Sequence, residues 1–230
     1  MATSDDLAHR LVDEVADALE PLADPEAAFA MAAYMKDRFV FLGIKTPVRR
    51  QETKRLLTRL AGTDAPTLLA FARGCWARPE REYQYVACDT LRKHAAALGP
   101  DDLDTVRGLI ETRSWWDTVD SLAVHTVGPM VAAHPELAEQ MDVWIDDDDI
   151  WVARTAILHQ LMYKGDTDDE RLFAYCDARA ADTEFFIRKA LGWALRQYAR
   201  TDPEAVRAYV ETNAELLSGL TKREALKHIA

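Results

Sequence analysis

The chain has 230 residues, of which 49% are hydrophobic, so it can bury a sizeable core as one large or two small domains. Its formal net charge of −11 argues against binding a polyanion unless the positive residues gather on one surface. The charges are unevenly spread, because eight basic residues stand against two acidic ones between Met31 and Leu60. This segment favours a basic face, although an ordinary solvated helix surface explains the same count.

The cysteines and the apolar stretches indicate the compartment in which the protein is expected. Cys75, Cys88 and Cys176 are odd in number and lack the spacing of a metal site, so we expect a reducing compartment, no disulfide and no bound metal. The N-terminus has no apolar secretion core, and no apolar run approaches the length needed to cross a bilayer. These features predict a cytoplasmic protein without a membrane partner.

Helical patterns follow one another along the chain, and strand patterns are almost absent. Nearly every segment between the prolines and glycines repeats apolar residues at steps of three and four. The expected helix starts carry a capping side chain, an early proline or acids in the first turn. In chain order these starts lie near Asp24, Thr46, Pro79, Asp101, Ser114, His134, Asp148, Asp168, Thr183 and Asp202.

The spacing of these starts indicates a repeat. Helices that open on aromatic residues begin at steps of 35, 34 and 35, near Pro79, Ser114, Asp148 and Thr183. The intervening helices begin at steps of 33, 34 and 34, near Asp101, His134, Asp168 and Asp202. A repeating two-helix unit predicts an all-α fold, an α-solenoid of antiparallel helix pairs (HEAT-like repeats), as a single domain over residues 1–230. An irregular helix bundle is the alternative.

The segment SWWDTVD, residues 114–120, places two tryptophans and two aspartates in seven residues. Ser114 suits an N-cap, and Asp117 suits its reciprocal capping partner. Trp115 begins an apolar stripe and is expected in the core. Trp116 and Asp120 are left unexplained, four residues apart on another face of the same helix. They are either a boundary tryptophan beside a solvated acid or parts of a site.

Trp193 lies off the apolar stripe of its expected helix. Its helical neighbours include Lys189, Arg196 and Arg200, so its indole is expected among positive groups. A surface ring stacked on arginine explains this arrangement, and so does a ring that meets a nucleic-acid sugar or base.

Arg154 interrupts an apolar face in the segment IWVARTAIL. Buried arginines are nearly always paired, which favours a structural ion pair between adjacent repeats. The alternative is that its fork of donors reaches a phosphate of a bound nucleic acid.

Together these segments resemble the bacterial AlkD family of DNA alkylation repair enzymes, DNA glycosylases built on HEAT-like repeats. The similarity extends across most of the chain. The segments that carry it are AAYMKDRFVFLGIKTPVRR, RPEREYQYVACDTL, SWWDTVD, IWVARTAIL, EFFIRKALGWALRQYAR and LTKREALKHI.

The resemblance assigns roles to particular positions. It implies that Asp120 is catalytic, that Trp116 and Trp193 form the site, and that Arg154 and Tyr34 contact DNA. It also implies excision of positively charged N3- and N7-alkylated purines from duplex DNA without base flipping, by a monofunctional enzyme without cofactor or metal. Further candidates for phosphate contacts are Lys36, Lys45, Arg49, Arg50, Lys189, Arg196 and Arg200.

These assignments predict a monomer that binds double-stranded DNA along a concave face. Two other functions fit the same architecture: a non-catalytic protein that binds damaged DNA, and a helical-repeat scaffold for a protein partner. The charge on the face that bears the site distinguishes a scaffold from a DNA-binding protein.

Overall fold

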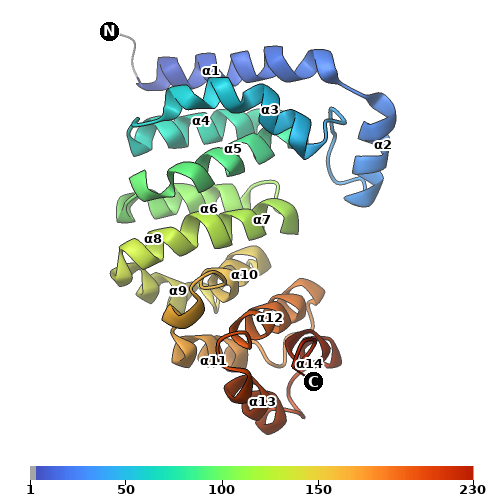
Figure 1. Cartoon of the computed structure of the whole chain (residues 1–230), viewed down its shortest axis with the longest axis vertical. Coiled ribbons are helices and arrows are strands. Elements are labelled where there is room, and N and C mark those ends of the chain that lie inside the picture. Colours follow the sequence, from blue (N-terminus) through green and yellow to red (C-terminus); the bar gives the residue numbers. More distant parts are fainter. Residues whose placement is uncertain (1–3, 230) are drawn as a thin grey trace. The chain divides into compact units, whose positions relative to one another are not determined.

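The structure is a computed structural model that describes residues 4–229 and is built from helices (Figure 1). Over this range no strand forms beyond a single bridge between Val40 and Glu80, so the predicted all-α class is confirmed. No helix among these residues has the length and hydropathy needed to span a bilayer. The chain divides into unit 1, Met1–Leu109, and unit 2, Ile110–Ala230. The single domain over residues 1–230 stays a prediction.

Unit 1 is a stack of helices that pack along their apolar stripes. Helix α1 contacts α3 and α4, and α4 contacts α5. On α1 the side chains of Leu11, Val15 and Leu19, at the spacing of one helical face, are fully buried. The helices are α1 (Ser4–Leu19), α2 (Pro25–Tyr34), α3 (Thr46–Leu57), α4 (Ala65–Ala77), α5 (Arg81–His94) and α6 (Leu103–Glu111), which ends inside unit 2.

A buried carboxylate fixes the loop between α2 and α3. Glu82 of α5 is fully buried and accepts hydrogen bonds from the backbone N–H groups of Leu42, Gly43 and Ile44, at 3.0, 2.9 and 3.1 Å. Gly43 has a φ of +91°, and a Cβ there would lie 2.1 Å from the carbonyl oxygen of Asp24, so only glycine fits. The loop that leads into the basic helix α3 is therefore held to α5 rather than left loose.

Replacing Glu82 by glutamine is expected to lower the free energy of unfolding by about 2 kcal/mol. The amide would turn one N–H toward the three backbone donors and leave at least one of them buried without an acceptor. Urea denaturation followed by circular dichroism measures the loss. The exposed Glu52→Gln variant is the control, and an equal midpoint for both variants would contradict the role of Glu82.

Unit 2 repeats a pair of helices. Its principal helices are α7 (Trp116–Leu122), α8 (Gly128–Ala133), α9 (Ala138–Trp144), α10 (Ile150–Leu158), α11 (Asp169–Ala178), α12 (Phe185–Tyr198), α13 (Pro203–Thr212) and α14 (Gly219–Ala225). A π-helical segment, Ala123–Val127, joins α7 to α8. Asp149, Asp168 and Asp202 cap α10, α11 and α13 with their side chains, close to the predicted starts.

Contacts between successive repeats confirm the period read from the sequence. Helices α7, α10, α12 and α14 pack in one row, and side chains of α9, α11 and α13 bond to one another in a second row. Bonded residues in adjacent repeats are separated by 34, 35, 33 and 32 positions in the pairs Asp120–Arg154, Lys189–Glu224, Asp142–Tyr175 and Asp177–Tyr209. A residue therefore meets its equivalent position in the next helix pair, as expected for a helical repeat.

Candidate functional site

One pocket in unit 2 collects the side chains singled out by the sequence. It has a volume of about 360 Å³, within the usual range of ligand sites, and is formed by the row α7, α10 and α12. The predicted residues on its wall are Trp116, Asp120, Arg154, Lys189, Trp193 and Arg196. Phe185 and Phe186 complete the lining. Residues from three successive repeats thus meet although up to 80 positions separate them, since each repeat places its aromatic-opened helix in the same row.

Asp120 and Arg154, both in the lining of this pocket, form a bidentate ion pair. Nε of Arg154 donates to Oδ1 of Asp120 at 2.7 Å, and a terminal nitrogen donates to Oδ2 at 2.9 Å. Its other terminal nitrogen donates to the carbonyl oxygen of Phe186. The Arg154 side chain is 4% exposed and that of Asp120 is 15% exposed. The structure therefore supports the ion pair between repeats over a direct phosphate contact, because the fork of Arg154 is turned toward protein oxygens.

The surroundings of Asp120 act on its pKa in opposite directions. Burial raises the pKa of this carboxyl above its usual value, while the hydrogen bonds and the positive charge of Arg154 lower it and nearby Asp117 raises it slightly. Burial is the largest effect, so the net direction is upward. An ionised Asp120 in this pocket therefore depends on Arg154.

Trp116 and Trp193 are half-buried on the wall of the pocket, where part of each ring surface stays accessible. Trp115 points instead into a cluster with Trp151 and Phe186, with ring centroids 5.6 and 4.9 Å from its own. That cluster joins α7, α10 and α12 behind Arg154. The prediction that Trp115 and Trp116 face different surroundings is correct, although Trp115 itself is only partly buried.

The predicted capping of α7 is wrong in detail. Helix α7 begins at Trp116, and its N-cap residue is Trp115, whose side chain makes no capping hydrogen bond. The hydroxyl of Ser114 donates to the carbonyl oxygen of Ile110 at 2.7 Å instead. The reason is that Ser114 completes the end of the preceding helix, whose last carbonyls also need partners. Asp117 is therefore not the reciprocal partner of a Ser114 cap.

Lys189 and Arg196, both predicted to contact phosphates, share one acidic partner. Nζ of Lys189 lies 2.6 Å from Oε1 of Glu224, and Arg196 donates to the other carboxylate oxygen. Glu224 lies on α14, and only its position 35 residues after Lys189, close to the repeat period, could have indicated this contact from the sequence. Arg200, beyond the end of α12, is exposed and stays a predicted DNA contact.

Unit 1 carries the remaining predicted DNA contacts. Tyr34, Lys36 and Lys45 are exposed around the loop between α2 and α3. Arg50 is exposed, yet it is paired with Asp89 at 2.5 Å. The phosphate contact predicted for Arg49 does not fit the structure. Arg49 is buried, is paired with Asp89 and lies over the ring of Tyr85, so its guanidinium is turned toward protein groups. Tyr34, Lys36, Lys45 and Arg50 stay predicted contacts.

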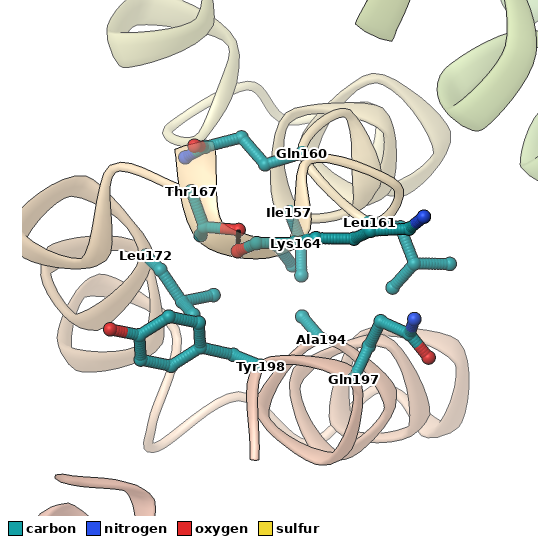
Figure 2. A pocket seen from close by; sticks show the side chains of 9 residues that line it. All are labelled: Ile157, Gln160, Leu161, Lys164, Thr167, Leu172, Ala194, Gln197 and Tyr198. Carbon is teal, nitrogen blue, oxygen red and sulfur yellow. Dashed lines mark hydrogen bonds between the residues drawn. The ribbon is translucent and has the colours of Figure 1, made fainter. Parts of the chain in front are cut away.

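A second cavity in unit 2 lies between α10, α11 and α12 and is lined by residues such as Ile157, Leu172 and Tyr198 (Figure 2). Its volume of about 10 Å³ holds at most a single water molecule. It is a packing gap rather than a ligand site. Residues 4–229 contain no cluster of three His, Cys, Asp or Glu side chains arranged to hold a metal ion.

Comparisons with known proteins point to one family. A family described as DNA alkylation repair enzyme matches residues 15–229. A structure described as a predicted DNA alkylation repair enzyme from Enterococcus faecalis is 32% identical, with a TM-score of 0.84 over 90% of this chain and 97% of that chain. The Pseudomonas fluorescens alkylpurine DNA glycosylase AlkC bound to DNA containing an abasic site analog shares the fold, with a TM-score of 0.55 and 16% identity over 97% of this chain and 62% of that chain. No curated protein matches the chain.

Proposed function

The chain belongs to the DNA alkylation repair enzyme family, and from this premise we propose that it is a DNA glycosylase for positively charged N3- and N7-alkylated purines in duplex DNA. The observation that carries the proposal is the pocket in which the Asp120–Arg154 pair lies beside Trp116 and Trp193. A carboxylate next to aromatic faces suits a reaction in which positive charge develops on a sugar.

Excision of a cationic base does not require the protein to supply a general acid. An alkylated purine such as 3-methyladenine or 7-methylguanine is cationic, so it leaves with the electrons of its glycosidic bond as a neutral base and needs no acid. As that bond stretches, positive charge moves onto the deoxyribose. Asp120 would stabilise this charge and orient the water that attacks the sugar carbon, and its carboxylate would accept the proton that this water then gives up. The faces of Trp116 and Trp193 would attract the sugar more strongly as its charge grows.

Arg154 fits this reaction as a positioning residue. Its two hydrogen bonds occupy one side of the Asp120 carboxylate, which has about four lone-pair sites, so other sites are left for water or substrate. The pair also holds the carboxylate in one orientation and opposes the effect of burial on its pKa. As the resemblance to the AlkD family implies, we expect the base to be excised without being flipped into the protein, unlike the substrates of most glycosylases.

The purified chain is expected to release 3-methyladenine or 7-methylguanine from methylated duplex DNA without added metal or cofactor. Chromatography of the released bases under single-turnover conditions measures the rate. Duplex binding, followed by fluorescence anisotropy, shows whether the enzyme is saturated. If bases are released no faster than the spontaneous rate while binding is saturated, the protein only binds damaged DNA. That result would refute the proposed glycosylase activity.

A further inference from the structure

Helix α14 packs closely against α12, which forms one wall of the pocket. A Cβ at Gly192 of α12 would lie 2.5 Å from the Cβ of Glu224 and 2.9 Å from the carbonyl oxygen of Thr221, so glycine permits this approach. The hydroxyl of Thr221 donates to the carbonyl oxygen of Arg188 at 3.1 Å, which fixes the register of the two helices. Together these contacts bring a carboxylate of α14 against the polar face of α12.

That carboxylate belongs to Glu224, and it binds both cations that flank Trp193. Lys189 precedes the tryptophan by one turn and Arg196 follows it by nearly one turn, so the two lie along one side of α12. Each oxygen of Glu224 receives one of them. The Glu224 side chain is 16% exposed. Hydrogen bonding from Lys189 is the largest effect and lowers the pKa of Glu224, and the charges of Lys189 and Arg196 lower it as well. Burial raises this pKa but is outweighed, so the net direction is downward and Glu224 is ionised at neutral pH.

Every cation of the pocket therefore has an acidic partner, although Lys189 and Arg196 share one carboxylate and keep one net positive charge between them. Arg154 is paired with Asp120, while Lys189 and Arg196 are paired with Glu224. Without Glu224, two cations would face the space beside Trp193, where they would attract phosphates and repel a cationic base or sugar.

We propose that Glu224 is a positioning residue that holds Lys189 and Arg196 and offsets one of their two positive charges, so that the pocket repels less strongly a substrate that is cationic and becomes more so at the sugar. This inference rests on the proposed glycosylase function and goes beyond it. In this arrangement Lys189 and Arg196 hold Trp193 in place between them and contribute little to binding the DNA backbone, contrary to the phosphate contacts predicted for them.

The test compares Glu224→Gln with Glu211→Gln, which removes the same charge from an exposed position of α13. Glu224→Gln is expected to bind duplex DNA more tightly at low salt and to steepen the slope of log K against log salt by up to about 2, since two cations become free. Its single-turnover excision rate is expected to fall by about tenfold, as when an outer partner of a site residue is lost. Glu211→Gln should match the wild type in slope and rate, and Glu224→Asp should restore the wild-type slope.

Lys189→Met keeps the test decisive if Glu224→Gln does not fold. A lysine held by Glu224 is turned away from the phosphates, so its loss should leave the salt slope unchanged, whereas a slope shallower by about 1 would overturn the proposal. A folded Glu224→Gln protein that binds more weakly, or that excises at the wild-type rate, would also overturn it. The salt slopes are measured on unmodified duplex. They therefore test whether Glu224 keeps Lys189 and Arg196 from the phosphates even if the wild type releases no base and the glycosylase proposal fails.

Discussion

Replacing Asp120 by asparagine is expected to slow base excision by about 100- to 1,000-fold, the usual loss when one preorganised electrostatic partner is removed. The amide has nearly the shape of the carboxylate and can still accept a hydrogen bond from Arg154, but it carries no negative charge to stabilise the sugar cation. The loss falls on the transition state rather than on the bound duplex. Affinity for DNA should therefore change much less than the rate.

Single-turnover release of 7-methylguanine, paired with anisotropy titrations on the same duplex, separates the two effects. Asp148→Asn is the matched control, because it removes the same charge from an exposed position of unit 2 outside the pocket. Circular dichroism confirms that both variants are folded at the assay temperature. If Asp120→Asn lost binding and excision to the same extent, Asp120 would be a structural residue and the proposed mechanism would fall.

Replacing Arg154 by methionine is expected to destabilise the protein by about 3–5 kcal/mol, the usual loss when one partner of a buried ion pair is removed. Methionine fills part of the volume but leaves the Asp120 carboxylate buried without its cation, and it also removes the donor to the carbonyl oxygen of Phe186. The double variant Asp120→Asn with Arg154→Met should lose less stability than the sum of the single variants, because no unpaired charge stays buried.

The stability and the excision rate of the single variant Arg154→Met are expected to depend on pH. Arg154 lowers the pKa of Asp120, so removing it lets burial raise that pKa further. A carboxyl with a raised folded-state pKa loses stability as pH rises through its unfolded value of about 3.9, and regains it on acidification. The stability deficit of Arg154→Met should therefore shrink in acid, and the acid limb of its excision profile should move to higher pH.

Urea denaturation at several pH values measures the loss of stability in Arg154→Met. Single-turnover rates over the same pH range locate the acid limb of its excision profile. Arg200→Met is the control for stability, because Arg200 is exposed and should change the free energy of unfolding by no more than about 0.5 kcal/mol. Equal stability of Arg154→Met and Arg200→Met would show that the ion pair contributes nothing, and Arg154 would then lose its positioning role.

The repeat and the residues of the pocket could be predicted from the sequence because they depend on local periodicity. A spacing near 34 residues brings equivalent positions of successive helices together, and bonded pairs such as Asp142–Tyr175 follow it at 33. Trp116, Asp120 and Trp193 were recognisable because they lie off the apolar stripes of their own helices, a property that each helix displays alone. The sequence also predicts Ile187, Leu191, Leu195 and Tyr198 on the buried stripe of α12, and the first three are fully buried whereas Tyr198 is half-buried.

Partners were beyond prediction, because a helical pattern shows which face a residue occupies but not what the neighbouring helix places against it. The sequence favoured an ion pair for Arg154 without naming its partner, and the packing of α10 on α7 supplies Asp120 as that partner. Arg49 belonged to a basic segment, yet the packing of α3 on α5 buried it beneath Asp89. The contact of Glu224 with Lys189 and Arg196 depends on Gly192, which lets α14 approach α12 closely. Sequence alone determined the helical repeat and the unusual tryptophans and acid, whereas the tertiary structure decided which charges cancel, because ion pairing requires atoms from separate helices to lie within a few ångströms.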